Sequence, residues 1–153
     1  MAEITISFES VSESDFDALA QLRIDAMRES LERVGRFDPI RARERLKKTF
    51  DPRATEWIVR GGQRIGFYAM RKTDSGYSLD HLYIHPKYQR LGYGAQVLGF
   101  LKAKSDREGL PVKVGALRES DSNQFYRREG FRKISEDEWD IYYTYRGTEG
   151  TET

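Results

Sequence analysis

The sequence contains no cysteine among its 153 residues. That absence excludes disulfides, thiolate nucleophiles and cysteine-ligated zinc. Histidine is almost as scarce, since only His81 and His85 occur, too few for most histidine-based metal sites. No apolar run approaches the roughly 20 residues that a membrane span needs, and residues 1–5 lack the basic and apolar segments of a signal peptide. We therefore expect a cytoplasmic protein with neither a metal nor a membrane partner.

Net charge is also nearly absent. Lysine and arginine number 26 against 25 aspartates and glutamates, which leaves a formal charge of +1. Such a balance provides no electrostatic case for a nucleic-acid partner. The length is that of one domain with a real hydrophobic core. We expect a single domain over residues 1–147, followed by a disordered polar tail at 148–153.

Hydrophobic periodicity and turn residues predict the order βααβββαβαββ. Three consecutive strands joined by tight turns should be antiparallel, and the strand–helix–strand unit of residues 77–117 should place parallel neighbours side by side. The predicted fold is α/β, of the α+β type, with a mixed central β-sheet flanked by helices. The expected strands are 4–8, 57–60, 64–70, 77–84, 112–117, 131–134 and 140–145, and the expected helices begin near residues 12, 39, 91 and 120.

Residues 82–95 form the most informative segment, a strand, a short turn and a glycine-containing loop that enters a helix. Free amides and a partial positive charge at a helix start suit a phosphate group. Gly92 and Gly94 would let the backbone approach an anion, and Arg90 would add a charge-assisted contact. The alternative is a helix start whose small residues serve close packing. No Gly-Lys-Ser/Thr and no third glycine follow, so triphosphate loops and the dinucleotide fingerprint fit poorly.

Two motifs in this order resemble a known family. The hexapeptide Gln89-Arg90-Leu91-Gly92-Tyr93-Gly94 meets the signature Gln/Arg-x-x-Gly-x-Gly/Ala of the GNAT family of N-acetyltransferases. The later segment 122–131, with Phe125-Tyr126 and Gly130-Phe131, is similar to the family's asparagine-rich helix that ends in Phe-Tyr-x-x-x-Gly-Phe. The resemblance extends over about residues 66–143 and implies an acyl-CoA N-acyltransferase-like fold.

The resemblance implies transfer of an acetyl group from acetyl-CoA to a primary amine of a small molecule or peptide, by direct attack in a ternary complex. It also allows for a homodimer built through edge strands. A departure is Glu119, which stands where the family often has asparagine. The implied cofactor contacts are the pyrophosphate on loop amides, the pantetheine on a strand main chain as in β-augmentation, and one contact from the later helix. The pyrophosphate contacts are the amides of Gln89, Arg90, Leu91, Gly92, Tyr93, Gly94 and Ala95. The pantetheine contacts are the main chain of Leu82, Tyr83 and Ile84, and the contact from the later helix is Asn123.

Tyr126 matches the family's tyrosine that donates a proton to the departing thiolate. Attack on a thioester needs a neutral amine, a polarised carbonyl and a proton for the leaving sulfur, and a tyrosine can supply that proton. The alternative is an ordinary half-buried aromatic whose hydroxyl caps a backbone group. The resemblance favours the catalytic role.

A base for the substrate ammonium is sought on the strand at residues 77–84. Ser78, Asp80, Leu82 and Ile84 share one face, because strand residues alternate. Family members often place an acid or histidine at the sites equivalent to Ser78 and Asp80, which leaves Asp80, acting through water. The alternative is a structural carboxylate paired with a neighbouring arginine. His81 lies on the opposite face and is interpreted as a packed or hydrogen-bonded residue.

The acceptor itself is not indicated by the sequence. In this fold the first two helices and the final hairpin form the acceptor wall. Charged residues on those helices are interpreted as solvated surface, whereas Trp139, Tyr142, Tyr143 and Tyr145 are candidates to line a small pocket. A competing hypothesis is a non-catalytic acyl-CoA-binding sensor, which would retain residues 89–95 without needing Tyr126.

Overall fold

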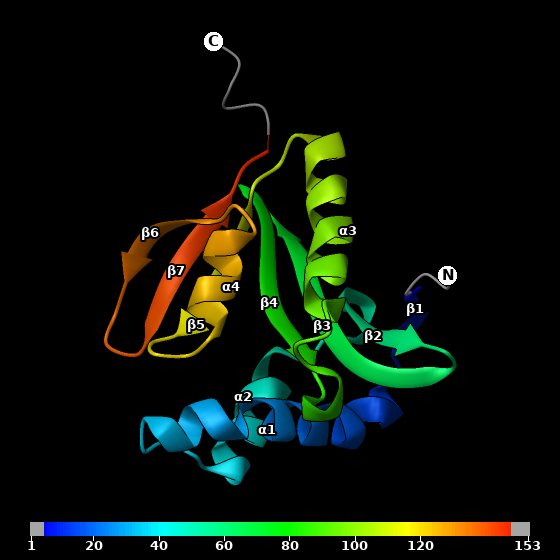
Figure 1. The fold of residues 1–153 in the computed structure, drawn as a ribbon. Helices are drawn as coiled ribbons and strands as arrows, with labels where there is room; N and C mark the ends of the chain where they lie inside the picture. Colours follow the sequence, from blue (N-terminus) through cyan, green and yellow to red (C-terminus); the bar gives the residue numbers. More distant parts are fainter. Residues whose placement is uncertain (1–4, 148–153) are drawn as a thin grey trace. The chain divides into compact units, whose positions relative to one another are not determined.

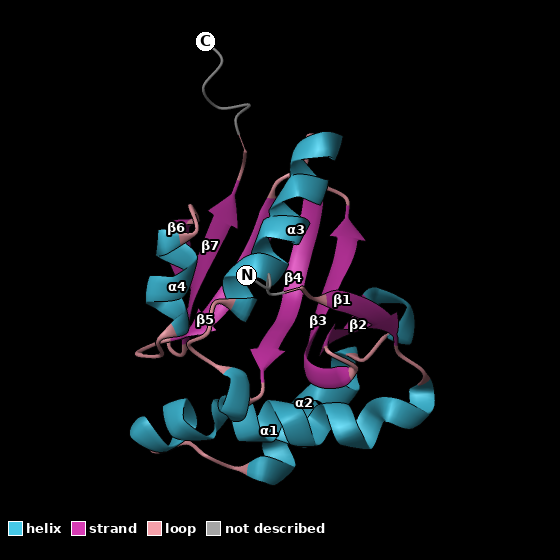
Figure 2. Cartoon of the chain, turned by 45° about the vertical axis from the view of Figure 1, so that its right-hand side comes forward, coloured by secondary structure: helices cyan, strands magenta, loops and turns pink. Residues whose placement is uncertain are grey.

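The computed structural model describes residues 5–147 (Figure 1). Helices and strands follow in the predicted order βααβββαβαββ, with three short 3₁₀ turns added (Figure 2). The fold is mixed α/β, with a mixed sheet and flanking helices, as predicted. The expected tail at 148–153 and the first residue of the expected strand at 4–8 lie outside the described residues.

The chain divides into two compact units. Unit 1 contains the described residues up to Ala69 together with His81–Gln96, and unit 2 contains Met70–Asp80 together with the described residues from Val97 onward. Two strands, β3 (Gln63–Thr73) and β4 (Gly76–Ile84), and the helix α3 (Tyr93–Glu108) have residues in both units. The hydrogen-bonded strand order is β1-β2-β3-β4 in unit 1 and β3-β4-β5-β7-β6 in unit 2.

Unit 1 is built on antiparallel strands. β1 (Ser7–Ser10) pairs with β2 (Thr55–Arg60), and β2 pairs with β3. The turn between β2 and β3 has positive φ at both Gly61 (59°) and Gly62 (78°), which matches the right-handed twist of a hairpin. The predicted strand at 4–8 is displaced, because pairing with β2 begins only at Ser7. Alternation alone does not fix such a boundary.

The helices of unit 1 lie side by side (Figures 1 and 2). The turn η1 (Glu13–Asp15) leads into α1 (Phe16–Arg33), and α2 (Pro39–Thr49) starts with a proline and an Asp38 cap that accepts from the Arg41 amide. A second turn, η2 (Pro52–Ala54), precedes β2. The core of unit 1 consists of apolar side chains from both helices and the strands, namely Val11, Leu19, Ala20, Leu22, Leu46, Trp57, Val59 and Phe67.

Unit 2 contains the predicted parallel pair. β4 pairs with β5 (Val112–Leu117) from Tyr77↔Val112 to Leu79↔Val114, and α3 is the helix between them in sequence. β7 (Asp140–Tyr145) is antiparallel to both β5 and β6 (Arg132–Glu136). The short helix α4 (Ser122–Arg128) is two residues shorter at its start than predicted, because Asp121 occupies the N-cap position.

Candidate functional site

The loop that enters α3 has an unusual backbone. Arg90 has φ 66° and Gly92 has φ 90°, so two of its residues are left-handed. Among the described residues, Arg90 and Glu119 are the only non-glycine residues with positive φ. A non-glycine residue tolerates this region only at a cost in free energy, and such residues cluster at ligand-binding loops. α3 begins at Tyr93 rather than at the expected Leu91 for the same reason, since Gly92 does not continue a helix.

The amides at the start of α3 lie before the first hydrogen bond of the helix. The first helical hydrogen bond of α3 joins the Gln96 amide to the Gly92 carbonyl at 3.1 Å. The amides of Tyr93, Gly94 and Ala95 therefore precede the hydrogen bonding of the helix. Gly92 is exposed, and a Cβ placed on it would meet nothing within 4 Å, so backbone conformation and not crowding requires glycine there. Successive amides next to left-handed residues form a concave anion site.

Side chains tie this loop to β4, a feature that the sequence analysis missed. Gln89 Nε2 donates to the Ile84 carbonyl at 2.8 Å, and the amide of Lys87 donates to His85 Nδ1 at 3.1 Å within the turn η3 (Pro86–Tyr88). Tyr88 donates its hydroxyl proton to Gln63 Oε1 at 2.7 Å. The first residue of the signature is thus a brace between strand and loop, in addition to any amide contact.

The end of β4 is packed closely against β3. A Cβ at Gly66 would collide with the carbonyl oxygen of Tyr83, and the amide of His85 donates to the Ile65 carbonyl at 2.8 Å. Glycine inside a predicted strand was the available signal for this close approach. Because successive residues of a strand direct their main-chain groups to opposite edges, Leu82 and Ile84 direct theirs away from β3.

His81 lies in a chain of hydrogen bonds within unit 1. Arg23 Nε donates to the Tyr83 hydroxyl at 3.0 Å, the same oxygen lies 3.1 Å from His81 Nδ1, and His81 Nε2 lies 3.2 Å from Thr49 Oγ1. Arg23 can only donate, so the Tyr83 oxygen accepts from it. His81 is hydrogen-bonded on both nitrogens, as predicted, and its lack of a catalytic role stays a prediction.

Arg23 is the buried end of that chain. Only 8% of the residue is exposed, and its Nη1 donates to the Ala42 carbonyl of α2 at 2.7 Å. The guanidinium carbon also lies 5.7 Å from the centre of the Tyr83 ring. Arg23 therefore connects α1, α2 and β4 within unit 1, a role that helix periodicity did not reveal.

Asp80 has the arginine partner that the sequence left open. Arg71 Nε donates to Asp80 Oδ2 at 2.6 Å and Nη2 to Oδ1 at 3.3 Å, while Ser78 Oγ donates to Oδ1 at 2.7 Å. The Asp80 side chain is 19% exposed and that of Arg71 54%. Ser78 reaches Asp80, and His81 reaches Tyr83, so the two-residue alternation holds through this part of β4. The ion pair is present, and the role of Asp80 as a base stays a prediction.

Tyr126 lies in an aromatic cluster of unit 2. The residue is 5% exposed, and its ring centre lies 5.1 Å from that of Phe125, 5.3 Å from Phe131 and 6.3 Å from Tyr143. The amide of Phe131 donates to the Tyr126 carbonyl at 3.0 Å and closes the helix. These contacts fix the ring, as expected from the motif, and the hydroxyl's role as an acid stays a prediction.

Asn123 is buried and heavily engaged. Its Nδ2 donates to the Leu117 and Ser120 carbonyls at 2.9 and 3.0 Å, and its Oδ1 accepts from the Tyr143 hydroxyl at 2.8 Å. The strained Glu119, with φ 69°, precedes this helix. Both amide protons are used within unit 2, so a cofactor contact from the side chain would use the second lone pair of Oδ1.

The aromatic residues of the last hairpin do not all face one way. Tyr143 is completely buried, whereas Tyr142 donates to Asp137 Oδ2 at 2.8 Å and Tyr145 to the Asp106 carboxylate at 3.1 Å. The hydrogen bond to Asp137 raises the pKa of Tyr142 to about 12, and burial is the main cause of the raised pKa of Tyr145. Both hydroxyls are therefore protonated donors at neutral pH. Trp139, by contrast, is 43% exposed.

Over residues 5–147 no three histidine, aspartate or glutamate side chains gather as a metal site would require. In the same range no helix has the length and apolar character needed to cross a membrane. The structure thus brings the loop 89–95 together with the end of β4 in unit 1, and Asn123 together with Tyr143 and Tyr126 in unit 2. In unit 1 the backbone of the loop 89–95 suits an anionic ligand, and in unit 2 Tyr126 is held in a buried aromatic cluster.

Comparison with known proteins agrees with this interpretation. A family model described as an acetyltransferase (GNAT) domain matches residues 52–133, more than half of the chain. No curated protein sequence matches the chain. Many solved structures share the fold, at low sequence identity.

Three of these structures are informative. PaiA N-acetyltransferase from Thermoplasma acidophilum, in complex with coenzyme A, has a TM-score of 0.76 at 14% identity, over 94% of this chain and 99% of its own. The ribosomal-protein-S18-alanine N-acetyltransferase from Escherichia coli has a TM-score of 0.69 at 14% identity, over 93% and 94%. N-acetylglutamate synthase from Neisseria gonorrhoeae, complexed with coenzyme A and N-acetyl-glutamate, has a TM-score of 0.66 at 18% identity, over 95% and 36%. At such identities the likeness concerns the fold.

Proposed function

This chain belongs to the GNAT acetyltransferase family, and from that premise we propose that it transfers the acetyl group of acetyl-CoA to a primary amine in a ternary complex. The observation that carries the proposal is the loop 89–95, where left-handed Arg90 and Gly92 precede the free amides of α3. Coenzyme A is present in the similar PaiA and N-acetylglutamate synthase structures, and its pyrophosphate is the anion that such a loop accepts.

The pantetheine arm is proposed to pair with β4 beyond the parallel ladder. That ladder with β5 ends at Leu79. Tyr83 directs its carbonyl toward Gly66 of β3, and the Ile84 carbonyl accepts from Gln89. The groups that remain for a ligand amide are the amide and carbonyl of Leu82 and the amide of Ile84. Of the three predicted strand residues, Leu82 and Ile84 are therefore the two that would make main-chain hydrogen bonds.

Acetyl-CoA supplies an activated thioester, and the residues of the chain are proposed to move the protons. The nitrogen of the neutral amine bonds to the thioester carbon as the carbon–sulfur bond breaks. Tyr126 donates its hydroxyl proton to the departing sulfur, and Asp80, through water, accepts the proton that the amine loses. The contacts of the Tyr126 ring with Phe125, Phe131 and Tyr143 support this role, because they hold the ring in one orientation.

The Asp80 assignment is supported by its place on the same face of β4 as Leu82 and Ile84. Arg71 and Ser78 orient its carboxylate. The Arg71 side chain is 54% exposed, which leaves water access to the Arg71–Asp80 ion pair. His81 has both nitrogens engaged on the other face and is proposed to hold β4 in place.

The acceptor is proposed to be a primary amine of a small molecule or a peptide. The similar structures include one enzyme named for a protein alanine and one that holds N-acetyl-glutamate. The test is incubation with acetyl-CoA and a panel of amino acids, polyamines and peptides, followed by free thiol and by mass spectrometry of the acceptor. Equal amounts of thiol and acetylated acceptor support the proposal, and acceptor-independent thiol release contradicts it.

A further inference from the structure

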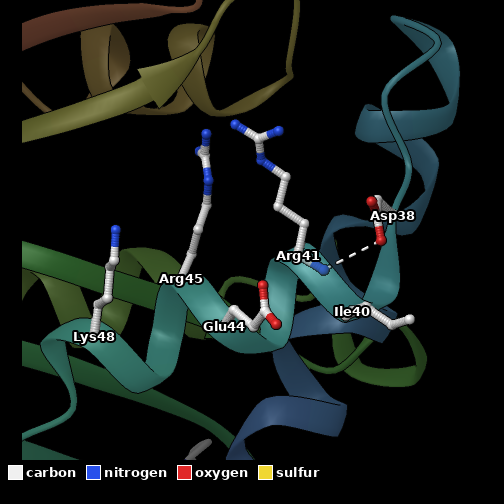
Figure 3. A pocket seen from close by; sticks show the side chains of 6 residues that line it. All are labelled: Asp38, Ile40, Arg41, Glu44, Arg45 and Lys48. Atoms are coloured by element: carbon white, nitrogen blue, oxygen red, sulfur yellow. Dashed lines mark hydrogen bonds between the residues drawn. The ribbon is translucent and has the colours of Figure 1, made fainter.

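The short helix α4 lacks a side-chain cap at its start. Its N-cap residue, Asp121, makes no side-chain hydrogen bond to the amides of the first turn. In α2, by contrast, the carboxylate of Asp38 accepts from the Arg41 amide at 3.1 Å, as Figure 3 shows. α4 has only seven residues, and a helix of about two turns is not stable by its own hydrogen bonds. Its position therefore depends on contacts with other parts of unit 2.

Two side chains of α4 make such contacts. Asn123 and Tyr126 are the buried residues of the helix, at 8% and 5% exposed, and their spacing of three residues places them on one face. Asn123 Nδ2 donates to the Leu117 carbonyl at the end of β5 at 2.9 Å and to the Ser120 carbonyl at 3.0 Å. Asn123 therefore attaches the first turn of α4 to β5 and to the connection between them.

Tyr143 of β7 contacts both of these side chains. Its hydroxyl donates to Asn123 Oδ1 at 2.8 Å, and its ring centre lies 6.3 Å from that of Tyr126. Tyr143 is fully buried, and its strand is paired on both sides, with β5 and with β6. The sheet thus holds the tyrosine, and the tyrosine holds the face of α4 that carries Tyr126.

The hydrogen bond between Tyr143 and Asn123 is buried, so its loss has a consequence for the helix. Without the hydroxyl, Asn123 Oδ1 lacks this donor in the interior, a cost in free energy that favours a shift of the first turn. The other end of α4 stays attached, because Lys102 Nζ donates to the Glu129 carbonyl at 2.7 Å. A misplacement of about 1 Å near a reacting group can lower a rate about 10²-fold.

We propose that Tyr143 and Asn123 are positioning residues for Tyr126, and that the side chain of Asn123 serves this purpose in place of a cofactor contact. The inference rests on the proposed function, because Tyr126 is the acid of that reaction. Tyr126 itself gives its proton to the departing sulfur. Tyr143 and Asn123 act only through the orientation of Tyr126, so their removal should affect turnover and not the affinity for acetyl-CoA.

The test is a double-mutant cycle of Tyr143→Phe and Tyr126→Phe in single-turnover kinetics. Tyr143→Phe removes one hydroxyl and keeps the ring, and we expect kcat to fall about 10–10²-fold. The dissociation constant of acetyl-CoA should change by less than about twofold. In protein that already carries Tyr126→Phe, the same change should lower kcat by less than about twofold, because its effect passes through the missing hydroxyl. Asn123→Ala should give the same pattern.

Tyr77→Phe is the matched control. Tyr77 is likewise a buried tyrosine of unit 2, 7% exposed, and its hydroxyl donates to Glu108 Oε1 at 2.7 Å. This variant should keep its kcat while losing a comparable amount of thermal stability. Full additivity of Tyr143→Phe and Tyr126→Phe overturns the inference. Binding of acetyl-CoA that is weaker by about tenfold or more in Asn123→Ala, with kcat unchanged, also overturns it, because Asn123 is then a cofactor contact.

A readout without turnover separates this inference from the proposed reaction. In protein with ¹³C-labelled tyrosine rings, the NMR signals of Tyr126 should broaden in Tyr143→Phe, as the ring samples more than one orientation, and should keep their width in Tyr77→Phe. Unchanged signals in both variants overturn the inference. If the Tyr126 signals broaden as expected while the unaltered protein acetylates no amine, the positioning stands and the proposed reaction fails.

Discussion

Asp80 and His81 are neighbours in β4, yet their surroundings are opposite in kind. Asp80 is held by an ionic contact with Arg71, whose side chain is more than half exposed, and by the hydroxyl of Ser78. His81 is held by hydroxyl groups on both nitrogens, in a chain that begins at the buried Arg23. Asp80 therefore pairs with an exposed side chain, whereas His81 belongs to a hydrogen-bond chain that ends at a buried arginine.

We expect substitutions on the two sides of β4 to have different effects on stability. An exposed ion pair contributes only about 0–1 kcal/mol to stability, so the Asp80 side can be altered with little effect on folding. A buried donor that loses its acceptor costs about 1–3 kcal/mol, so the His81 side should respond in stability. The proposed roles are also divided between the two units, because the cofactor loop belongs to unit 1 and Tyr126 to unit 2. Four sets of substitutions test these contrasts.

The largest effect is expected in the loop of unit 1. Gly94→Val places a branched side chain among the amides before Gln96, and we expect acetyl-CoA binding to be lost in calorimetry while circular dichroism stays unchanged. The matched control is Gly99→Val, the same change at an exposed glycine of the same helix with open space around it. Unchanged affinity in Gly94→Val would refute the phosphate-loop proposal.

Tyr126→Phe should affect turnover without affecting acetyl-CoA binding. We expect kcat to fall about 10²–10⁴-fold, as for loss of a general acid, with little change in the dissociation constant of acetyl-CoA. Single-turnover kinetics and calorimetry measure the two quantities. If kcat stays within a factor of a few when chemistry limits the rate, Tyr126 has a packing role alone.

Asp80→Asn and His81→Ala test the comparison directly on β4. Asp80→Asn should lower kcat by about 10²-fold, at the low end for an acid–base group because water relays the proton, and should remove the acidic limb of the pH–rate profile. His81→Ala should keep the shape of that profile and lower thermal stability. The reverse pattern would make His81 the base, and unchanged profiles in both would mean that the amine arrives neutral from solvent.

The smallest effect concerns stability alone. Tyr83→Phe removes the acceptor of Arg23 Nε and the hydroxyl partner of His81 Nδ1, so urea denaturation should show a loss of about 1–3 kcal/mol. Its counterpart Arg71→Gln should cost about 0–1 kcal/mol, because its ion pair is exposed. Equal losses in both variants would show that the two sides of β4 do not differ as described.

Much of the fold was predictable because turn residues mark the hairpins and the alternation of apolar residues marks the strands. Glycines 61 and 62 marked the first hairpin, and β5 and β7 have the predicted bounds. The start of β1 was missed, since pairing with β2 decides it. The start of α3 was set too early, since the positive φ of Arg90 and Gly92 belongs to a loop that periodicity does not register.

For the candidate site, residue types and face assignments were predictable, and partners were not. The alternation separated Asp80 from His81 correctly, yet it did not indicate that Arg71 is the partner of Asp80, because that depends on how β3 lies against β4. Burial of Arg23 and the brace from Gln89 to Ile84 were likewise invisible, since both depend on contacts between segments far apart in the sequence or on side-chain direction.

The most direct test of the central claim is acceptor-dependent release of free thiol from acetyl-CoA by the unaltered protein, with the acetylated acceptor quantified in the same samples. We predict equal amounts of thiol and product, and strong suppression of both in Tyr126→Phe at full acetyl-CoA occupancy. Tight binding of acetyl-CoA without thiol release, across amino acids, polyamines and acidic and neutral peptides, would contradict the account and identify the chain as an acyl-CoA sensor.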